Sequence, residues 1–315
     1  MRCLYCYQLL AEYEIDFHVA CSKKIFGQTT VPELPYGADE MRNLALQVVQ
    51  NQITVTGVQA KLSLHLTSDK QKKEPKRFTI VGLWGGYILK PASPNYPEMV
   101  EVEDLTMHLA SIAKIKVVPH SLIRLKSGGL AYITKRIDRI GAQKLHMEDM
   151  CQLTERLTEN KYLASYEQIA KAISKYSSRP GLDVVDFYEQ VLFSFLTGNA
   201  DMHLKNFSVI YGQSSPPILT PAYDLLSTAL VNPADTEDLA LTLNGRKKKL
   251  KRSDFIAAFT TARLDAKQQD NLFRKMEKAK LKWLEFILIS FLSEDFKAKY
   301  LELIEERFRR LVANE

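Results

Sequence analysis

Long apolar runs are missing from this sequence of 315 residues. The longest one, residues 286–292 (FILISFL), is far shorter than the roughly 20 residues that a helix needs to cross a bilayer. The N-terminal residues also lack the form of a signal peptide. We therefore expect a protein of the cytoplasm that does not enter a membrane.

The sequence also has few cysteines and no segment of biased composition. Four cysteines do not make a disulfide framework in a chain of this size, and neither an internal repeat nor a low-complexity linker occurs. With 46% hydrophobic and 25% charged residues, the composition excludes extensive disorder.

The net charge of +6 implies only some affinity for polyanions such as nucleotide phosphates or nucleic acid. A prior of roughly 150 residues per domain predicts two domains or lobes.

Three of the four cysteines lie close to a histidine near the N-terminus. The pattern Cys3-x2-Cys6-x11-His18-x2-Cys21 offers two close pairs of ligands, a spacing typical of a tetrahedral structural zinc site. Such a metal would hold the segment together and would leave no open position for catalysis. The alternative is a small N-terminal cap with reduced, partly buried cysteines and with His18 bonded to the backbone.

The hydrophobic pattern changes along the chain from strands to helices. Strands are predicted at residues 53–56, 62–66, 78–81, 84–90, 115–118, 121–125 and 130–134, with one helix beginning near Met99. Helices are predicted at residues 183–196, 265–292 and 293–311. We therefore predict an α+β fold with two lobes: a Cys/His segment (residues 1–30), a small strand-rich N-lobe (31–136) and a larger helical C-lobe (137–315).

A dense polar cluster, residues 198–206 (GNADMHLKN), lies between an apolar helical pattern and an apolar strand pattern. Asp201 and Asn206 are five residues apart, and Asp224 follows eighteen residues after Asn206. Kinases place a catalytic base and two metal ligands in this order. Asp201 is a candidate acceptor for a hydroxyl proton, and Asn206 and Asp224 offer oxygen ligands to Mg²⁺ if residues 207–210 and the following segment form a hairpin.

Candidates for binding the phosphates of ATP occur upstream. Lys90 lies at the end of a predicted strand and is kept extended by Pro91, and Glu103 thirteen residues later is placed to hold its ammonium group. The turn around Gly57 offers backbone N–H groups, to which Lys61 adds charge. Together with the polar cluster, these residues predict a site for phosphoryl transfer.

Each candidate also has an ordinary interpretation. Lys90 and Glu103 could be solvated surface charges, and Asp201 could be a local helix cap. Gly57 lacks the further glycines of a kinase or dinucleotide loop. His203 is expected to orient or pack rather than to bind a metal. The order of all the parts favours one phosphoryl-transfer site, because their joint occurrence by accident is much less probable.

The sequence resembles the HipA-type serine/threonine kinases, which are toxins of bacterial toxin–antitoxin systems. The matching segments, in family order, are residues 57–61 (GVQAK), 87–91 (YILKP), 132–139 (YITKRIDR), 146–149 (HMED), 198–207 (GNADMHLKNF) and 223–227 (YDLLS). Residues 241–245 (LTLNG) are similar to a further family segment.

The resemblance implies a bilobal protein-kinase-like fold that uses Mg-ATP. It implies that Asp201 is the catalytic base, that Lys205 assists near the transferred phosphate, and that Asn206 and Asp224 bind Mg²⁺. The residues that it implies for ATP binding are Gly57, Gln59, Lys61, Lys90, Glu103, Lys135, Ile137 and His203. The resemblance also implies that residues 135–137 form the hinge whose backbone meets adenine.

The start of the chain departs from the family pattern. Full-length members carry a further small N-terminal subdomain, whereas only the Cys/His segment precedes the kinase core here. The chain therefore resembles the shortened kinase of three-component HipBST-type systems. The partners implied are a helix-turn-helix antitoxin and a small HipS-like protein, with DNA bound only through the antitoxin. The family commonly phosphorylates its own hydroxyls just before the glycine-containing loop, which here are those of Thr54 and Thr56.

The first functional hypothesis is a kinase toxin that phosphorylates an aminoacyl-tRNA synthetase, so that translation stalls. A catalytically weak corepressor that joins an antitoxin and DNA is one alternative, and a kinase for a small molecule is another. The basic run at residues 246–252 (RKKKLKR) is interpreted as a solvated loop between a strand and a helix. A contact to the phosphate backbone of tRNA or DNA is the alternative for that run.

Overall fold

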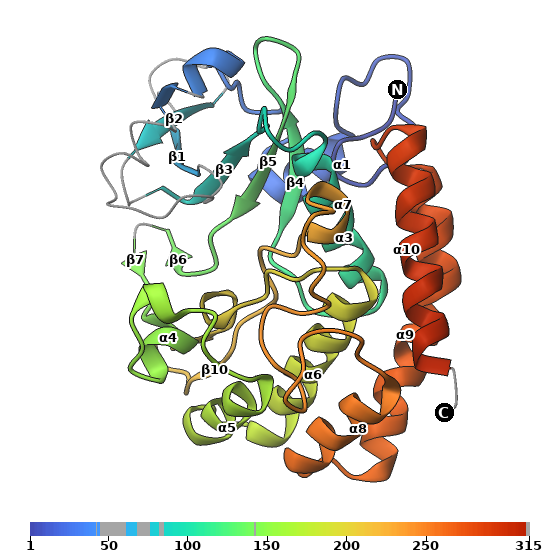
Figure 1. Cartoon of the computed structure of the whole chain (residues 1–315). Coiled ribbons are helices and arrows are strands. Elements are labelled where there is room, and N and C mark those ends of the chain that lie inside the picture. The colour runs from blue at the N-terminus through green and yellow to red at the C-terminus, as the bar shows by residue number, and fades with distance from the viewer. Residues whose placement is uncertain (42, 45–60, 68–75, 82–84, 142, 313–315) are drawn as a thin grey trace. The chain divides into compact units, whose positions relative to one another are not determined.

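The computed structural model describes residues 1–41, 43–44, 61–67, 76–81, 85–141 and 143–312 (Figure 1). The chain divides into two compact units. The first unit consists of Met1–Asp104 and Val118–Gln143, and the second of Leu105–Val117 and Lys144–Glu315. Helix α3 (Met99–Ile112) contributes its first residues to one unit and its remainder to the other.

The first unit contains an antiparallel sheet with the strand order β2-β1-β3-β5-β4. Its strands are β1 (Leu62–Thr67), β2 (Arg77–Val81), β3 (Tyr87–Pro91), β4 (His120–Arg124) and β5 (Leu130–Lys135). Lys90 pairs in register with Tyr132. Side chains alternate across β1, where Leu62 and Leu64 are buried and His65 is exposed. The predicted strands in these five regions are confirmed to within three residues at either end.

The strand predicted at residues 115–118 is wrong. Lys114 has a positive φ of 63° just after α3, and Pro119 lacks the N–H group that a strand would use for pairing. Only an isolated bridge between Val117 and Ala222 occurs there. The strand predicted at residues 53–56 lies outside the described residues, as does most of the lysine-rich segment after β1.

The N-terminal segment packs against the sheet of its own unit. Helix α1 (Val19–Phe26) ends at Gly27, whose φ of 72° is favourable for glycine. The Phe26 ring meets Phe78 edge-on with ring centroids 5.8 Å apart, and the Tyr87 hydroxyl donates to the Ile25 carbonyl at 3.1 Å. The Leu4 carbonyl accepts the backbone N–H of Leu122 at 3.3 Å, so the segment is tied to β4 as well.

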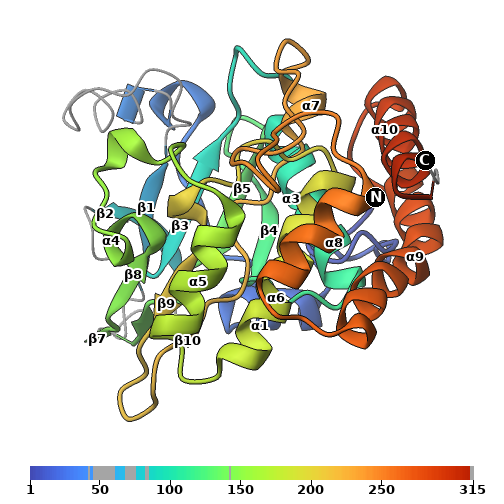
Figure 2. The same ribbon diagram turned by 60° about the horizontal axis from the view of Figure 1, so that its bottom comes forward.

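The second unit is mainly helical (Figures 1 and 2). Its helices are α4 (Met150–Leu153), α5 (Tyr166–Tyr176), α6 (Pro180–Leu196), α7 (Thr228–Val231), α8 (Arg252–Thr261), α9 (Ala266–Leu288) and α10 (Glu294–Val312). Short 3-10 turns occur at η1 (Thr158–Asn160) and η2 (Leu204–Asn206). Strands β8 (Met147–Asp149), β9 (Ser208–Ile210) and β10 (Ile218–Leu219) form a sheet in the order β10-β9-β8. Strand β6 (Arg139–Ile140), which belongs to the first unit, pairs with β7 (Gln143–Lys144), whose first residue ends that unit.

Helix α6 lies in the core of the second unit. It begins with Pro180, which has no N–H group to lose in the first turn, and most of its side chains are buried. The Trp283 ring of α9 meets Phe193 edge-on at 5.4 Å, and the Trp283 indole N–H donates to the Leu109 carbonyl at 2.8 Å. Helix α9 ends at Leu288, four residues earlier than predicted, and α10 begins at Glu294 as predicted to within one residue.

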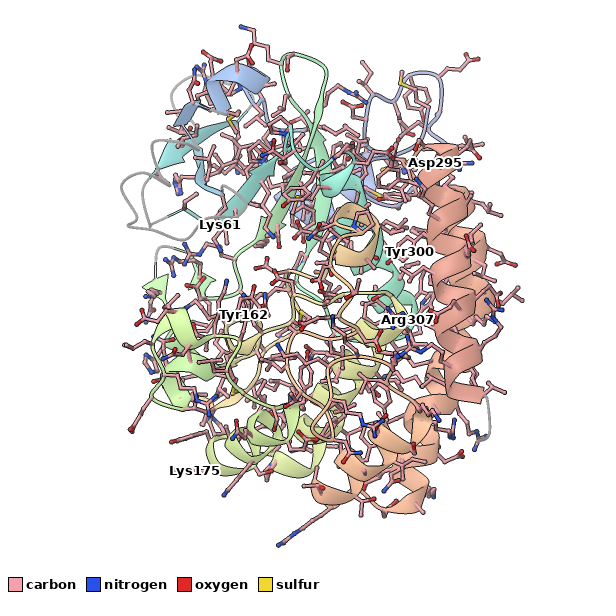
Figure 3. All side chains as sticks on the ribbon, viewed as in Figure 1. Lys61, Tyr162, Lys175, Asp295, Tyr300 and Arg307 are labelled. Carbon is pink, nitrogen blue, oxygen red and sulfur yellow. The ribbon has the colours of Figure 1, made fainter. Side chains whose placement is uncertain are left out.

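Helix α10 is held by a buried ionic network. Asp238 is 4% exposed, accepts from Arg307 and lies 2.5 Å from the nearest nitrogen of Arg310. Burial opposes ionisation of Asp238, but hydrogen bonds from Arg310 and Arg307 outweigh it and hold the pKa of the carboxyl below its usual range. Tyr300 and Arg307, seven residues apart on α10, are both buried (Figure 3).

Within the described residues, no helix combines the length and apolarity that crossing a bilayer requires.

Candidate functional site

In the first unit, Lys90 forms a buried ion pair with Glu103. Lys90 is the penultimate residue of β3 and is 6% exposed, and its Nζ lies 2.6 Å from Oε1 of the fully buried Glu103 on α3. The Tyr132 ring on β5 lies 5.5 Å from the same Nζ. The alternative interpretation of these two residues as solvated surface charges is therefore wrong.

Burial of this pair has a physical cost. Removing each charge from water costs several kcal/mol, and the mutual attraction offsets that cost only where the geometry is favourable. A buried ion pair is thus weak evidence for stability. The position of Lys90 at the end of a strand, with its ammonium held by one carboxylate, favours a role in binding an anion.

The structure describes three of the five other residues that are predicted to bind ATP in the first unit. Gly57 and Gln59 lie outside the described residues, together with Thr54 and Thr56. Lys61 is exposed immediately before β1 (Figure 3), and Lys135 is exposed at the end of β5. Ile137 is half-buried in the segment that follows. Their binding to ATP stays a prediction.

In the second unit, the polar cluster follows the end of α6. Gly198 has a φ of 67°, which turns the chain away from the helix. Asp201 is exposed, its backbone N–H donates to Asn199 Oδ1 at 3.1 Å, and the Tyr162 hydroxyl donates to Asp201 Oδ1 at 2.5 Å. Tyr162 therefore fixes one carboxylate oxygen of a side chain that remains open to solvent. A carboxylate so placed is able to accept a proton from a bound hydroxyl.

His203 and Asn206 hold the turn η2 from both ends. His203 Nδ1 accepts the Lys205 backbone N–H at 3.3 Å, and Asn206 Oδ1 accepts the His203 backbone N–H at 3.2 Å. Burial lowers the pKa of His203 to about 4, although the carboxylates of Asp201 and Asp224 act on it in the opposite direction. The ring is therefore neutral at neutral pH and serves as a hydrogen-bond acceptor in the loop.

Lys205 forms an ion pair that the sequence did not indicate. Its Nζ lies 2.7 Å from Asp149 Oδ2, while Asp149 Oδ1 caps α4 by accepting the Gln152 backbone N–H at 3.0 Å. The Tyr223 hydroxyl contacts the Lys205 carbonyl at 3.0 Å and Ser208 Oγ at 2.6 Å. These contacts join the segment that carries Asp149 and the segment before Asp224 to the polar cluster.

The segment between Asn206 and Asp224 forms the expected hairpin. Strands β9 and β10 pair antiparallel, with Val209 opposite Leu219. Asp224 has a φ of 55°, a left-handed conformation that non-glycine residues adopt at a cost of about 1–3 kcal/mol and often at functional sites. The carboxylates of Asp224 and Asp201 both raise the pKa of His203, against the larger effect of burial. Amide and carboxylate oxygens of this kind suit Mg²⁺.

One family model matches the region that contains both the polar cluster and the buried Lys90–Glu103 pair. The HipA-like C-terminal domain matches residues 53–283 of the chain. The chain belongs to this family. Residues 1–30, with the Cys/His segment, precede the matched region of this HipA-like chain.

Relatives of the HipA-like chain carry names that provisionally call them kinases. One from Haemophilus influenzae is 30% identical over 210 residues, covering 63% of this chain and 59% of the relative. Y4dM from Sinorhizobium fredii is 34% identical over 211 residues, covering 62% of this chain and 50% of the relative. The chain thus spans about half the length of the curated relatives it matches.

Solved structures show the fold of the HipA-like chain. HipA of a Shewanella oneidensis toxin–antitoxin system, solved with HipB and its operator DNA, has a TM-score of 0.68 at 23% identity, over 88% of this chain and 71% of that one. The Helicobacter pylori proinflammatory kinase CtkA has a TM-score of 0.55 at 15% identity, over 80% of this chain and 94% of that one. The predicted α+β, kinase-like fold is confirmed.

The basic run of the HipA-like chain makes several contacts within its own unit. Lys247 Nζ lies 3.5 Å from Glu237, Lys248 Nζ donates to Thr236 at 2.7 Å, and the Arg252 guanidinium lies 3.8 Å from the Phe273 ring centre. These contacts fit the interpretation of a surface loop between a strand and a helix.

Replacing Gly198 by alanine is expected to destabilise the protein by about 1–3 kcal/mol. The positive φ disfavours a side chain, and the added Cβ would lie 2.7 Å from Leu303 Cδ2 and 2.9 Å from Ala229 Cβ. Urea unfolding measures the difference. The matched control is Gly181→Ala in α6, where no atom lies within 4 Å of the added Cβ and the expected change is between zero and about 1 kcal/mol of stabilisation. Equal stability of the two variants would contradict this account of the turn.

Proposed function

We propose that this chain is a cytoplasmic, Mg-ATP-dependent protein serine/threonine kinase that acts as the toxin of a toxin–antitoxin system. The observation that carries the proposal is the buried Lys90–Glu103 pair, in which an ammonium group is held at a strand end. Membership of the HipA-like family and the kinase names of its relatives support the proposal.

The roles of the residues follow from their chemistry. Lys90 binds the phosphates of ATP, and Asp201, fixed through one oxygen by Tyr162, accepts the proton of the attacking hydroxyl. Lys205 contributes positive charge near the transferred phosphate. Asn206 and Asp224 supply the oxygens that hold Mg²⁺, which when bound offsets charge on the phosphates.

The proposed substrate is a protein, with an aminoacyl-tRNA synthetase as the specific candidate. A purified chain incubated with γ-labelled ATP and Mg²⁺ in bacterial lysate is expected to label a discrete protein band. Mass spectrometry should then locate the phosphate on a serine or threonine of a synthetase. Label in a small molecule would contradict protein specificity, and no label in any fraction would favour the corepressor alternative.

Self-phosphorylation is the proposed regulation. The hydroxyls of Thr54 and Thr56 precede Gly57 in the sequence, although these residues lie outside the described part of the chain. Phosphate on either threonine would introduce about −1.5 to −2 charges beside a loop that is proposed to bind phosphates. A phosphopeptide map of the ATP-treated chain with neither threonine modified would contradict this step.

The proposed partners are a helix-turn-helix antitoxin and a small HipS-like protein. The Shewanella oneidensis HipA complex, which contains HipB and operator DNA, supports an antitoxin partner. We propose that DNA is reached only through the antitoxin.

A further inference from the structure

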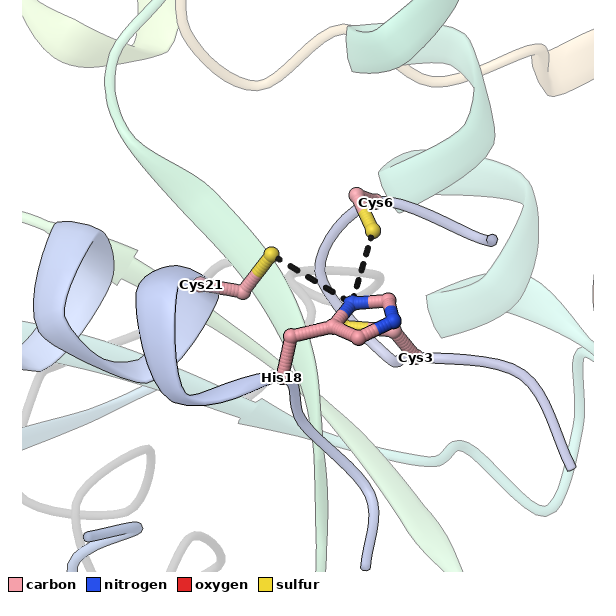
Figure 4. A group of neighbouring side chains, drawn as sticks. All are labelled: Cys3, Cys6, His18 and Cys21. Carbon is pink, nitrogen blue, oxygen red and sulfur yellow. Dashed lines mark hydrogen bonds between the residues drawn. The ribbon is translucent and has the colours of Figure 1, made fainter. Parts of the chain in front are cut away.

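Four side chains near the N-terminus converge in the first unit, and none of them is assigned a role in phosphoryl transfer. One ligand atom from each of Cys3, Cys6, His18 and Cys21 lies within 4.8 Å of the others (Figure 4). We infer that these four residues bind one structural Zn²⁺ ion.

The distances between the ligand atoms fit a tetrahedral site. Zn–S bonds of about 2.3 Å and Zn–N bonds of about 2.0 Å place neighbouring ligand atoms about 3.5–3.8 Å apart. His18 Nδ1 lies 3.4 Å from Cys6 Sγ and 3.8 Å from Cys21 Sγ (Figure 4). Hydrogen bonding accounts for one of these contacts only, because the single lone pair of Nδ1 accepts one thiol proton. A shared cation accounts for the convergence of all four groups.

The second nitrogen of His18 is oriented as in a metal-binding histidine. Nε2 lies 3.0 Å from the Leu9 carbonyl oxygen, to which it can only donate, and 3.7 Å from Glu14 Oε2. The proton on Nε2 leaves the lone pair on Nδ1, directed to the sulfurs. Histidines that bind metals almost always donate their other N–H to a carbonyl, a carboxylate or water, which fixes the tautomer.

Two local backbone structures supply the ligands in pairs. Cys3 and Cys6 lie on a tight loop in which the Cys3 N–H donates to the Gln8 carbonyl and the Tyr7 N–H to the Cys3 carbonyl, both at 2.9 Å. His18 is the residue before α1, and Cys21 lies in the first turn of that helix. The site therefore joins two elements that are separated by eleven residues in the sequence.

The ligand set decides the metal and its role. Three sulfurs and one imidazole are soft ligands that select Zn²⁺ over Mg²⁺ or Ca²⁺. Four protein ligands fill a tetrahedral site, so that no position remains for water or substrate. The ion is therefore structural, and its removal should alter the stability of the first unit.

The loop that carries Cys6 is connected to the core of its unit. Tyr7 is buried with a φ of 63°, and its hydroxyl donates to Asp104 Oδ2 at 2.8 Å. Asp104 also lies 2.6 Å from His120 Nδ1 on β4. Zinc bound to Cys6 would thus hold the backbone next to Tyr7. The Tyr7 hydroxyl bonds to Asp104, the residue after Glu103 on α3.

The test is the metal content of the full chain, purified with reductant and without chelator. About one zinc per chain is expected in the wild type and in the control Cys151→Ser, which removes the fourth cysteine of the sequence outside the cluster. His18→Ala should lose the zinc, whereas His18→Cys should keep it, because four cysteines also form a structural zinc site. Wild-type protein without zinc, or His18→Ala protein with full zinc content, would overturn the inference.

A second measurement on the wild type does not depend on the folding of a variant. Exchange of the metal for Co²⁺ should give the visible absorption bands of a tetrahedral thiolate complex, and a zinc chelator should lower the unfolding temperature. A disulfide between any two of Cys3, Cys6 and Cys21 in the isolated protein would overturn the inference, as would Co²⁺ bound without sulfur ligation.

Discussion

Asp201→Asn protein is expected to transfer phosphate about 10²–10⁴-fold more slowly than the wild type and to lose its ability to arrest growth. Asparagine has the shape of aspartate, and its Oδ1 still accepts the Tyr162 hydroxyl that lies 2.5 Å from the carboxylate in the wild type. The amide, however, has no basic oxygen with which to accept the substrate proton. Initial rates of transfer from labelled ATP, together with growth after induction, measure the two effects.

The control for this substitution is Asp270→Asn. Asp270 is an exposed aspartate on α9 that lies 3.4 Å from Arg274. Its replacement should change stability by less than about 0.5 kcal/mol and leave transfer at the wild-type rate. Growth arrest by Asp201→Asn protein at the wild-type level would refute the role of Asp201 as the base.

Lys90→Met protein is expected to lose about 10²–10³-fold in transfer rate and about 3–5 kcal/mol in stability. The rate falls because the phosphates lose a fixed positive charge. Stability falls because the Glu103 carboxylate, fully buried and 2.6 Å from Lys90 Nζ in the wild type, loses the partner of its ion pair. Urea unfolding and transfer assays on the same protein measure both quantities.

The double variant Lys90→Met/Glu103→Gln separates the two effects. Neutralising Glu103 removes the buried charge that Lys90 offsets in the wild type, so most of the lost stability should return while the transfer rate stays low. The control pair is Lys280 and Glu305, which are 2.7 Å apart but partly exposed. Lys280→Met should cost less than about 1 kcal/mol and leave transfer unchanged. Wild-type transfer by the double variant would show that Lys90 is a structural residue only.

Much of the fold could be predicted because its signals are local. Alternating apolar residues predicted β1, and the apolar spacing after Met99 predicted α3. The strand predicted at residues 115–118 was wrong although the residues are apolar. Lys114 before it has a left-handed backbone conformation, and Pro119 after it lacks an N–H group for strand pairing. The spacing of apolar residues shows which side chains can share a face, but it does not show the backbone conformation of the residues at either end.

The candidate site could be predicted only in part. Lys90 and Glu103 were paired from a strand end and a helix thirteen residues later, which is a short-range argument. The contacts of Tyr162 to Asp201 and of Asp149 to Lys205 join residues 39 and 56 positions apart. Asp149 at least lies in one of the segments that resemble the HipA family, whereas Tyr162 carries no sequence signal of its contact. Such long-range pairs depend on tertiary packing, which one sequence does not reveal.

We propose that this chain transfers phosphate from ATP to a protein hydroxyl with Asp201 as the base. The most direct test places purified wild-type and Asp201→Asn proteins side by side in lysate with γ-labelled ATP, with Mg²⁺ or with excess chelator. Phosphoserine or phosphothreonine in a discrete protein, formed only by the wild type and only with Mg²⁺, is the result that we predict. Absence of transfer by the wild type with Mg²⁺, or equal transfer by the two proteins, would contradict the claim.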